Sequence, residues 1–188
     1  MSTRNLWLVV TAVLGAVAAS PVAAQLPTYR VGRPPSAEEV TAWDLTIPAD
    51  GQGLPPGRGT AALGKPIYVE RCASCHGETG QDPKYNILVG GQGTLNTDKP
   101  VLSIGSFWSH APTLWSYINR AQPTDEPGSL TADQVYAVTA YLLHLNGIVK
   151  ADEIVDAATL PRIRMPNRDG FVPDPRPDIG PKAHRQPR

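Results

Sequence analysis

Hydrophobic residues recur at helical spacing most clearly between residues 130 and 147. Thr131 and Gln134 form a capping-box pattern, which marks the start of a helix, and Asn146-Gly147 is a typical helix end. Between these signals, four apolar residues repeat every three to four positions: Val135, Val138, Leu142 and Leu145. The pattern predicts an amphipathic helix with this apolar face against a core.

Two shorter segments have weaker helical patterns. The segment from Gly64 to Cys75 predicts a helix in which Pro66 is tolerated because it lies in the first turn. The segment from Pro112 to Ala121 predicts another helix, where Leu114 and Ile118 form an i, i+4 pair. No segment alternates apolar and polar residues for long enough to predict a sheet. The sequence therefore predicts an all-α domain with few, short helices.

The amino-terminal residues have the pattern of an export signal. Arg4 supplies a positive charge, and an uncharged apolar run of about fourteen residues follows it. The run is shorter than a membrane-spanning helix requires, and an uncleaved membrane anchor is the alternative. Val22-Ala23-Ala24 offers small residues to a signal peptidase. We therefore expect residues 1–24 to be a signal peptide cleaved after Ala24, which leaves a periplasmic chain with no membrane span.

The segments that flank the predicted helices are rich in proline and glycine. The chain has 20 Pro and 17 Gly, which indicates much irregular backbone. We expect residues 25–59 to form an extended arm, residues 60–172 the domain, and residues 173–188 a Pro-rich tail. A flexible linker is the alternative for the arm. Four apolar residues of the arm are expected to lie against the domain: Trp43, Leu45, Ile47 and Leu54.

The charge of the chain is balanced, with 17 basic and 17 acidic residues. Cleavage after Ala24 would remove only Arg4 from this count, so the mature chain stays close to neutral. A neutral chain offers no excess of positive charge to nucleic acid or to anionic lipid. We therefore expect no nucleic-acid partner.

The two cysteines of the chain lie together in the run Cys72-Ala73-Ser74-Cys75-His76. This is the C-x-x-C-H pattern by which a chain attaches haem c covalently. On a helix the two thiols share one face, so both can add to haem vinyl groups while His76 binds the iron. A disulfide is an alternative, whereas a zinc site would need a second Cys or His pair at ligand spacing. The motif predicts one haem c, with Cys72 and Cys75 as attachment residues and His76 as an axial iron ligand.

The predicted haem would give this loop-rich chain a large apolar body around which short helices can pack. His76 is expected to donate its other ring N–H to a backbone carbonyl. The indole N–H groups and Arg120 are candidate partners of a haem propionate, although a core position and a solvated helix face explain them as well. The candidate residues for the pocket wall are Leu88, Val89, Leu95, Trp108 and Trp115.

Other residues give the motif a family context. Gly64 and Tyr68 lie on the helix that carries the motif, and Tyr141 lies on the predicted last helix. With the motif, they resemble class I cytochromes c, in which small and aromatic residues form the crossing of the first and last helices. Further stretches resemble the cytochrome c subunits of bacterial sulfite and sulfane dehydrogenases. These stretches are Trp43-Asp44 with the run to Gly59, 88–95, 128–131, 135–143 and 165–171.

This resemblance implies a class I cytochrome c fold and a carrier of single electrons with no substrate chemistry of its own. It also implies a partner, since the donor would be a molybdenum-containing sulfite or sulfane dehydrogenase. Another cytochrome or a terminal oxidase would be the acceptor. The chain would then be the electron-transfer subunit of an oxidoreductase complex in sulfur oxidation. A subunit whose haem mainly tethers the long arms is an alternative.

The sixth iron ligand is the least determined part of the predicted site. Small class I cytochromes place Met-Pro just before the last helix, whereas this chain has Gln122-Pro123 there. Met165, followed by Pro166, is the one methionine left after signal cleavage and is the predicted ligand, since a thioether favours ferrous iron. An incidental loop methionine is the alternative, and the fallback ligands are His110, His144 and His184. Because Gln122 stands where methionine is expected, a second class of function stays possible. It is a haem enzyme or a gas or peroxide sensor with an open sixth iron position.

Overall fold

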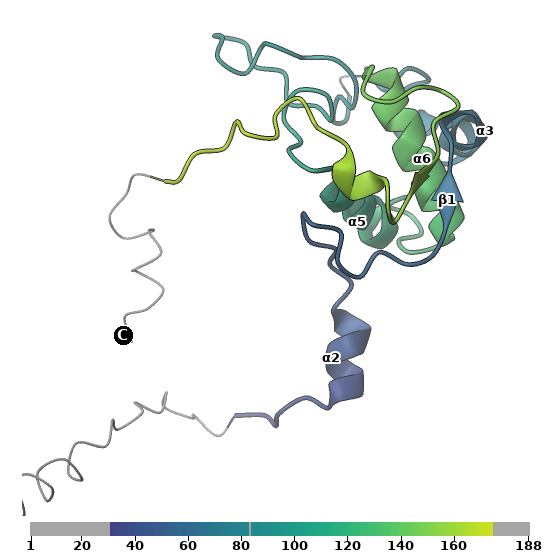
Figure 1. The fold of residues 1–188 in the computed structure, drawn as a ribbon, viewed down its shortest axis with the longest axis vertical. Coiled ribbons are helices and arrows are strands. Elements are labelled where there is room, and N and C mark those ends of the chain that lie inside the picture. The colour runs from purple at the N-terminus through teal and green to yellow at the C-terminus, as the bar shows by residue number, and fades with distance from the viewer. Residues whose placement is uncertain (1–30, 83, 175–188) are drawn as a thin grey trace, which may run out of the picture. The chain divides into compact units, whose positions relative to one another are not determined.

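Three helices form the frame of the domain: α3 (Ala61–Arg71), α5 (Ala111–Ala121) and α6 (Ala132–Leu145) (Figure 1). The structure is a computed structural model that describes residues 31–82 and 84–174. The shorter elements are α2 (Ala37–Trp43), α4 (Ala73–His76), the 3-10 helix η1 (Leu160–Arg162) and the strands β1 (Arg58–Gly59) and β2 (Val155–Asp156). The described chain is therefore mostly helical, as predicted.

Several predicted features lie outside the described residues. They are the signal peptide of residues 1–24, His184 and nearly all of the tail at 173–188. Within 31–82 and 84–174, no helix has the length and apolar character needed to cross a membrane.

Helix α6 begins and ends where its sequence signals predict. The Thr131 hydroxyl accepts a hydrogen bond from the Gln134 amide N–H, and the Gln134 side chain accepts one from the Thr131 N–H. At the other end, the Asn146 side chain donates to the Leu142 carbonyl at 2.9 Å. The burial differs from the prediction, because every residue from Val135 to Leu143 is buried. Helix α6 is therefore the centre of the core, packed by α3, α5 and both strands.

The helix predicted from Gly64 to Cys75 is two helices. Thr60 caps the start of α3, and the chain breaks at Cys72, whose φ of −127° and ψ of −33° separate α3 from α4. Because α3 begins at Ala61, Pro66 lies inside the helix and not in its first turn. Helix α3 crosses α6 at Gly64, where an added Cβ would overlap the Ala137 carbonyl oxygen. A glycine is required here by the close approach of the two backbones.

The arm docks on the domain only in its second half. Ile47 is buried, and its N–H donates to the Ser116 hydroxyl at 2.9 Å. Further along, β1 pairs with β2 in a two-stranded antiparallel sheet that the sequence did not predict. The prediction was wrong for Trp43 and Leu45, which are 86% and 52% exposed. Ser36 and Glu39 form a capping box at the start of α2, and α2 buries none of its side chains.

Tyr136 gives the fold a dependence on pH. Its buried hydroxyl donates to the Pro55 carbonyl at 2.9 Å, and burial raises the pKa of Tyr136 to about 12, compared with about 10 in an unfolded chain. The folded protein keeps this proton at pH values where the unfolded chain loses it. The free energy of unfolding should therefore be insensitive to this group below pH about 10 and fall between about 10 and 12.

Tyr136→Phe should make this alkaline fall less steep, while the lost hydrogen bond costs about 1 kcal/mol near neutral pH. Urea unfolding followed by circular dichroism across this pH range measures both effects. Tyr85→Phe is the matched control, because Tyr85 is 50% exposed and should leave the slope unchanged. A Tyr136→Phe slope as steep as that of the wild type would contradict the assignment.

Candidate functional site

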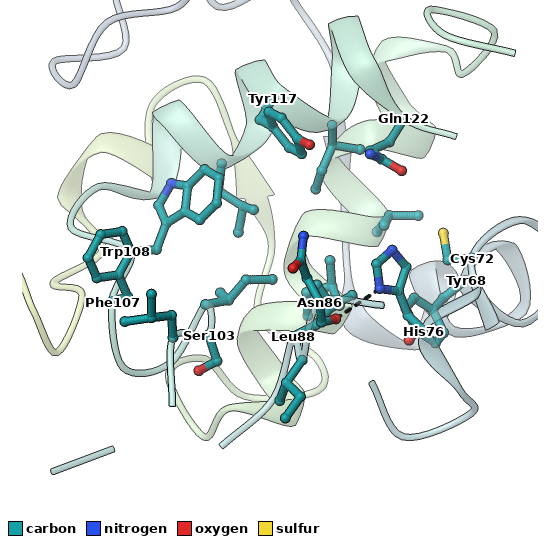
Figure 2. A pocket seen from close by; sticks show the side chains of 17 residues that line it. Tyr68, Cys72, His76, Asn86, Leu88, Ser103, Phe107, Trp108, Tyr117 and Gln122 are labelled. Atoms are coloured by element: carbon teal, nitrogen blue, oxygen red, sulfur yellow. Dashed lines mark hydrogen bonds between the residues drawn. The ribbon is translucent and has the colours of Figure 1, made fainter. Parts of the chain in front are cut away.

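A cavity of about 410 Å³ opens between α5, the inner face of α6 and the loops at 86–88 and 102–108 (Figure 2). Aliphatic and aromatic side chains form most of its wall. The polar side chains of the wall are Tyr68, Cys72, His76, Asn86, Ser103, Tyr117 and Gln122. A largely apolar cavity of this size with a few polar groups is typical of a cofactor or small-molecule site.

His76 lies in this wall, and one of its ring nitrogens is hydrogen-bonded to the backbone. Its Nδ1 is 3.1 Å from the carbonyl oxygen of Asn86, as the dashed line in Figure 2 marks. A carbonyl oxygen only accepts, so Nδ1 must carry the proton and donate it. In the neutral ring, the other nitrogen, Nε2, then has the lone pair that could bind a metal. This is the tautomer that the sequence analysis expected, and Asn86 supplies the carbonyl.

The two cysteines lie on the same short stretch but differ in exposure. Cys72 lines the cavity and is half-buried, whereas Cys75 is exposed, and both are free thiols. Burial raises the pKa of the Cys72 thiol to about 11, although the nearby Arg71 guanidinium lowers it. At neutral pH the Cys72 thiol is therefore uncharged, in keeping with the apolar wall beside it.

Two residues of the helical frame hold the loops around His76. The buried Tyr68 donates from its hydroxyl to the Gly77 carbonyl at 2.8 Å, which fixes the chain just after α4, and burial raises its pKa. Asn146 accepts from the Gly90 N–H at 3.0 Å and donates to the Leu88 carbonyl at 3.1 Å. From the sequence, Asn146 is expected only to mark the end of a helix. In the structure it ties the loop that carries the Asn86 carbonyl to α6.

The comparisons with known proteins agree with this architecture. The family model described as cytochrome c matches residues 61–146, the span from α3 to the end of α6. No curated protein matches the chain. The crystal structure of the sulfane dehydrogenase SoxCD from Paracoccus pantotrophus contains a chain 36% identical to this one, with a TM-score of 0.73. The match covers 85% of this chain and 79% of that chain.

The chain belongs to the cytochrome c family. The predicted all-α cytochrome c fold is thereby confirmed, and the family implies covalently attached haem c. The residues present fit such a group, because Cys72 and His76 line a mostly apolar cavity and Nε2 of His76 is available. Bound haem c would supply a one-electron iron couple, with Cys72 and His76 as the residues that would hold it, beside the apolar wall and the hydrogen bond that orients the His76 ring.

The prediction of the residues that line the cavity was partly right. Leu88 and Trp108 line the cavity, but Val89 and Leu95 do not. Trp115 does not line it either, because its ring packs against Tyr136 on α6 at 5.3 Å between centroids. The Trp115 N–H is buried without a hydrogen-bond partner among the described residues, whereas the Trp108 N–H donates to the Thr113 hydroxyl. The remaining propionate candidate, Arg120, is exposed and lies over the Tyr117 ring.

The described candidates for the sixth iron ligand do not line the cavity. Met165 is 1% exposed in the hydrophobic core and does not line the cavity. His110 bonds the Ser109 hydroxyl and His144 bonds the Val149 carbonyl, and neither lines the cavity. Gln122, the C-cap residue of α5, does line it. Met165 as the ligand stays a prediction from sequence, and it is tested directly below.

Proposed function

We propose that this cytochrome c carries single electrons in the periplasm and accepts them from a molybdenum-containing sulfite or sulfane dehydrogenase. One haem would be attached through Cys72 and Cys75, with His76 on the iron. The observation that carries the choice of donor is the 36% identity to a chain of a sulfane dehydrogenase across 85% of this chain. Another cytochrome or a terminal oxidase would receive the electrons. The export pattern of residues 1–24 supports the periplasmic location.

Apolar residues at the mouth of the cavity support contact with another protein. Leu102, Phe107 and Tyr117 line the cavity and yet are 57%, 40% and 39% exposed. We call these three residues the apolar rim. Because the chain is close to neutral, long-range attraction to a charged partner is weak, and burial of the apolar rim can supply the binding energy. A donor docked on the apolar rim would lie beside the cofactor site.

The donor assignment can be tested by stopped-flow reduction. The oxidised cytochrome is mixed with a sulfite dehydrogenase and sulfite, and separately with a sulfane dehydrogenase and its sulfane substrate. Haem reduction should be faster than in the enzyme-free controls. If neither enzyme accelerates it, the sulfur-compound donor is wrong. Reversible reduction by dithionite and oxidation by ferricyanide would still identify an electron carrier.

A variant of the apolar rim sharpens this test. Leu102→Glu should slow enzymatic reduction by about tenfold, because docking must then desolvate a carboxylate in an apolar contact. Leu63→Glu is the matched control, since Leu63 is 61% exposed on α3 but does not line the cavity. The control should react at the wild-type rate, and dithionite should reduce all three proteins equally fast. Equal slowing by both substitutions would contradict docking at the apolar rim.

A further inference from the structure

His76 and Gln122 reach the cavity from different elements. His76 belongs to α4, and its Nδ1–H bond to Asn86 places that loop on the side of the imidazole away from Nε2. Gln122 caps the end of α5, next to the wall formed by Leu114 and Ile118 of that helix. Figure 2 shows the His76 ring beside Cys72 and Tyr68, with the Gln122 amide above it in this view and a gap between the two side chains. A planar group that entered the space between these two side chains would have the imidazole on one face and Gln122 on the other.

The side-chain amide of Gln122 is only weakly hydrogen-bonded by the described residues. Its one hydrogen bond within the described ranges comes from the Thr124 hydroxyl at 3.5 Å, which is longer than an ordinary hydrogen bond. By contrast, the Tyr68 hydroxyl is used by the Gly77 carbonyl, and the Ser103 hydroxyl accepts from two backbone N–H groups. Gln122 is therefore available to the cofactor.

The Met165 side chain does not line the cavity, and the segment around it is held in place by several contacts. The Met165 side chain is fully buried in the core, and the Asn167 side chain donates to the Phe107 carbonyl at 2.8 Å. The rings of Phe107 and Phe171 also pack edge to face, 5.2 Å apart. To bring the sulfur to His76, the chain would have to empty a packed site and break these contacts, which close-packed interiors resist.

From these observations we infer that Gln122 faces the haem iron opposite His76, which leaves the reduced iron able to bind a small uncharged ligand such as carbon monoxide. An amide oxygen is a hard donor, and ferrous haem iron prefers softer ligands such as the thioether of Met. The amide N–H groups can also donate a hydrogen bond to a ligand held there. The inference rests on the haem attachment in the proposed function but not on the sulfur-compound donor.

The test compares the wild type with Gln122→Met and Met165→Leu. Attached haem is first measured as the pyridine haemochrome, and folding is checked by circular dichroism. The oxidised wild type should lack the weak sulfur-to-iron charge-transfer absorption, and its reduced form should bind carbon monoxide. Gln122→Met should gain that absorption and lose about a hundredfold in carbon monoxide affinity, because the thioether occupies the position almost all the time. Met165→Leu should keep the wild-type spectra.

Two outcomes would overturn the inference. If the wild type has the charge-transfer absorption and Met165→Leu abolishes it, Met165 is the ligand, as predicted from the sequence. If the wild type binds no carbon monoxide and Gln122→Ala does not change this, another side chain holds the iron. Absence of attached haem in the wild type would overturn the proposed function as well, whereas a failed assay with the sulfur-oxidising enzymes would leave the ligand result intact.

Discussion

Replacing Cys72 and Cys75 together by serine is expected to abolish covalent haem attachment. A serine hydroxyl does not form the thioether that a cysteine thiol forms with a haem vinyl group, so the haem should be removed from the variant by acid-organic extraction. The haem of the wild type should stay with the polypeptide after denaturation. Haem staining of a denaturing gel, with proteins expressed alongside a haem-maturation system, measures the difference.

Ser74→Ala is the control for this experiment, because Ser74 lies between the two cysteines and is exposed. It should retain haem like the wild type. His76→Ala tests a separate role, since the thiols remain but the available Nε2 is lost, and the absorption spectrum should change. Extraction of haem from the wild type would refute covalent attachment and with it the central part of the proposed function.

Gly64→Ala is expected to destabilise the fold by about 3 kcal/mol, a large share of the stability of a typical domain. The new Cβ would overlap the Ala137 carbonyl oxygen and lie 2.9 Å from the Cβ of Tyr141. These are backbone and near-backbone atoms, so a rotamer change cannot relieve the overlap, and α3 must move away from α6. Urea unfolding of the purified haem protein gives the change in the free energy of unfolding.

Leu63→Ala is the matched control on the same helix. Leu63 is 61% exposed, and its truncation should change the free energy of unfolding by no more than about 0.5 kcal/mol. If Gly64→Ala were as mild as this control, the close crossing of α3 and α6 would not be a requirement of the fold. Soluble yield serves as a second measurement if Gly64→Ala is too unstable to purify.

The parts of the fold that the sequence predicts well are those fixed by local chemistry. The capping box of Thr131 and Gln134 and the stop at Asn146 depend only on neighbouring residues, so α6 could be delimited from the sequence. The burial of α6 on all sides depends on contacts between distant segments. The exposure of Trp43 is a similar case, because an apolar residue alone does not show whether a core surface lies within its reach.

The same division applies to the site. The motif at Cys72 and His76 is local, and both residues line the cavity. The local sequence does not determine which side chains of α5 line the cavity. Trp115 packs against Tyr136, whereas Leu114 and Ile118 line the cavity. The different positions of Gln122, which lines the cavity, and Met165, which is buried in the core, also result from tertiary packing. A sequence-based search for a soft donor finds the methionine, whereas the structure brings the glutamine to the cavity wall.

The bond from His76 to Asn86 would affect the reduction potential of an iron bound by His76. A hydrogen bond at Nδ1 increases the basicity of the opposite nitrogen, and a more basic axial ligand favours the ferric over the ferrous state. The geometry of that bond depends on the loop that Asn146 anchors to the end of α6. Asn146 does not line the cavity, yet its two bonds set the position of the loop. With His76 on the iron, the reduction potential would thus be adjustable from the residue that caps the end of the central helix, without any change in the groups that line the cavity.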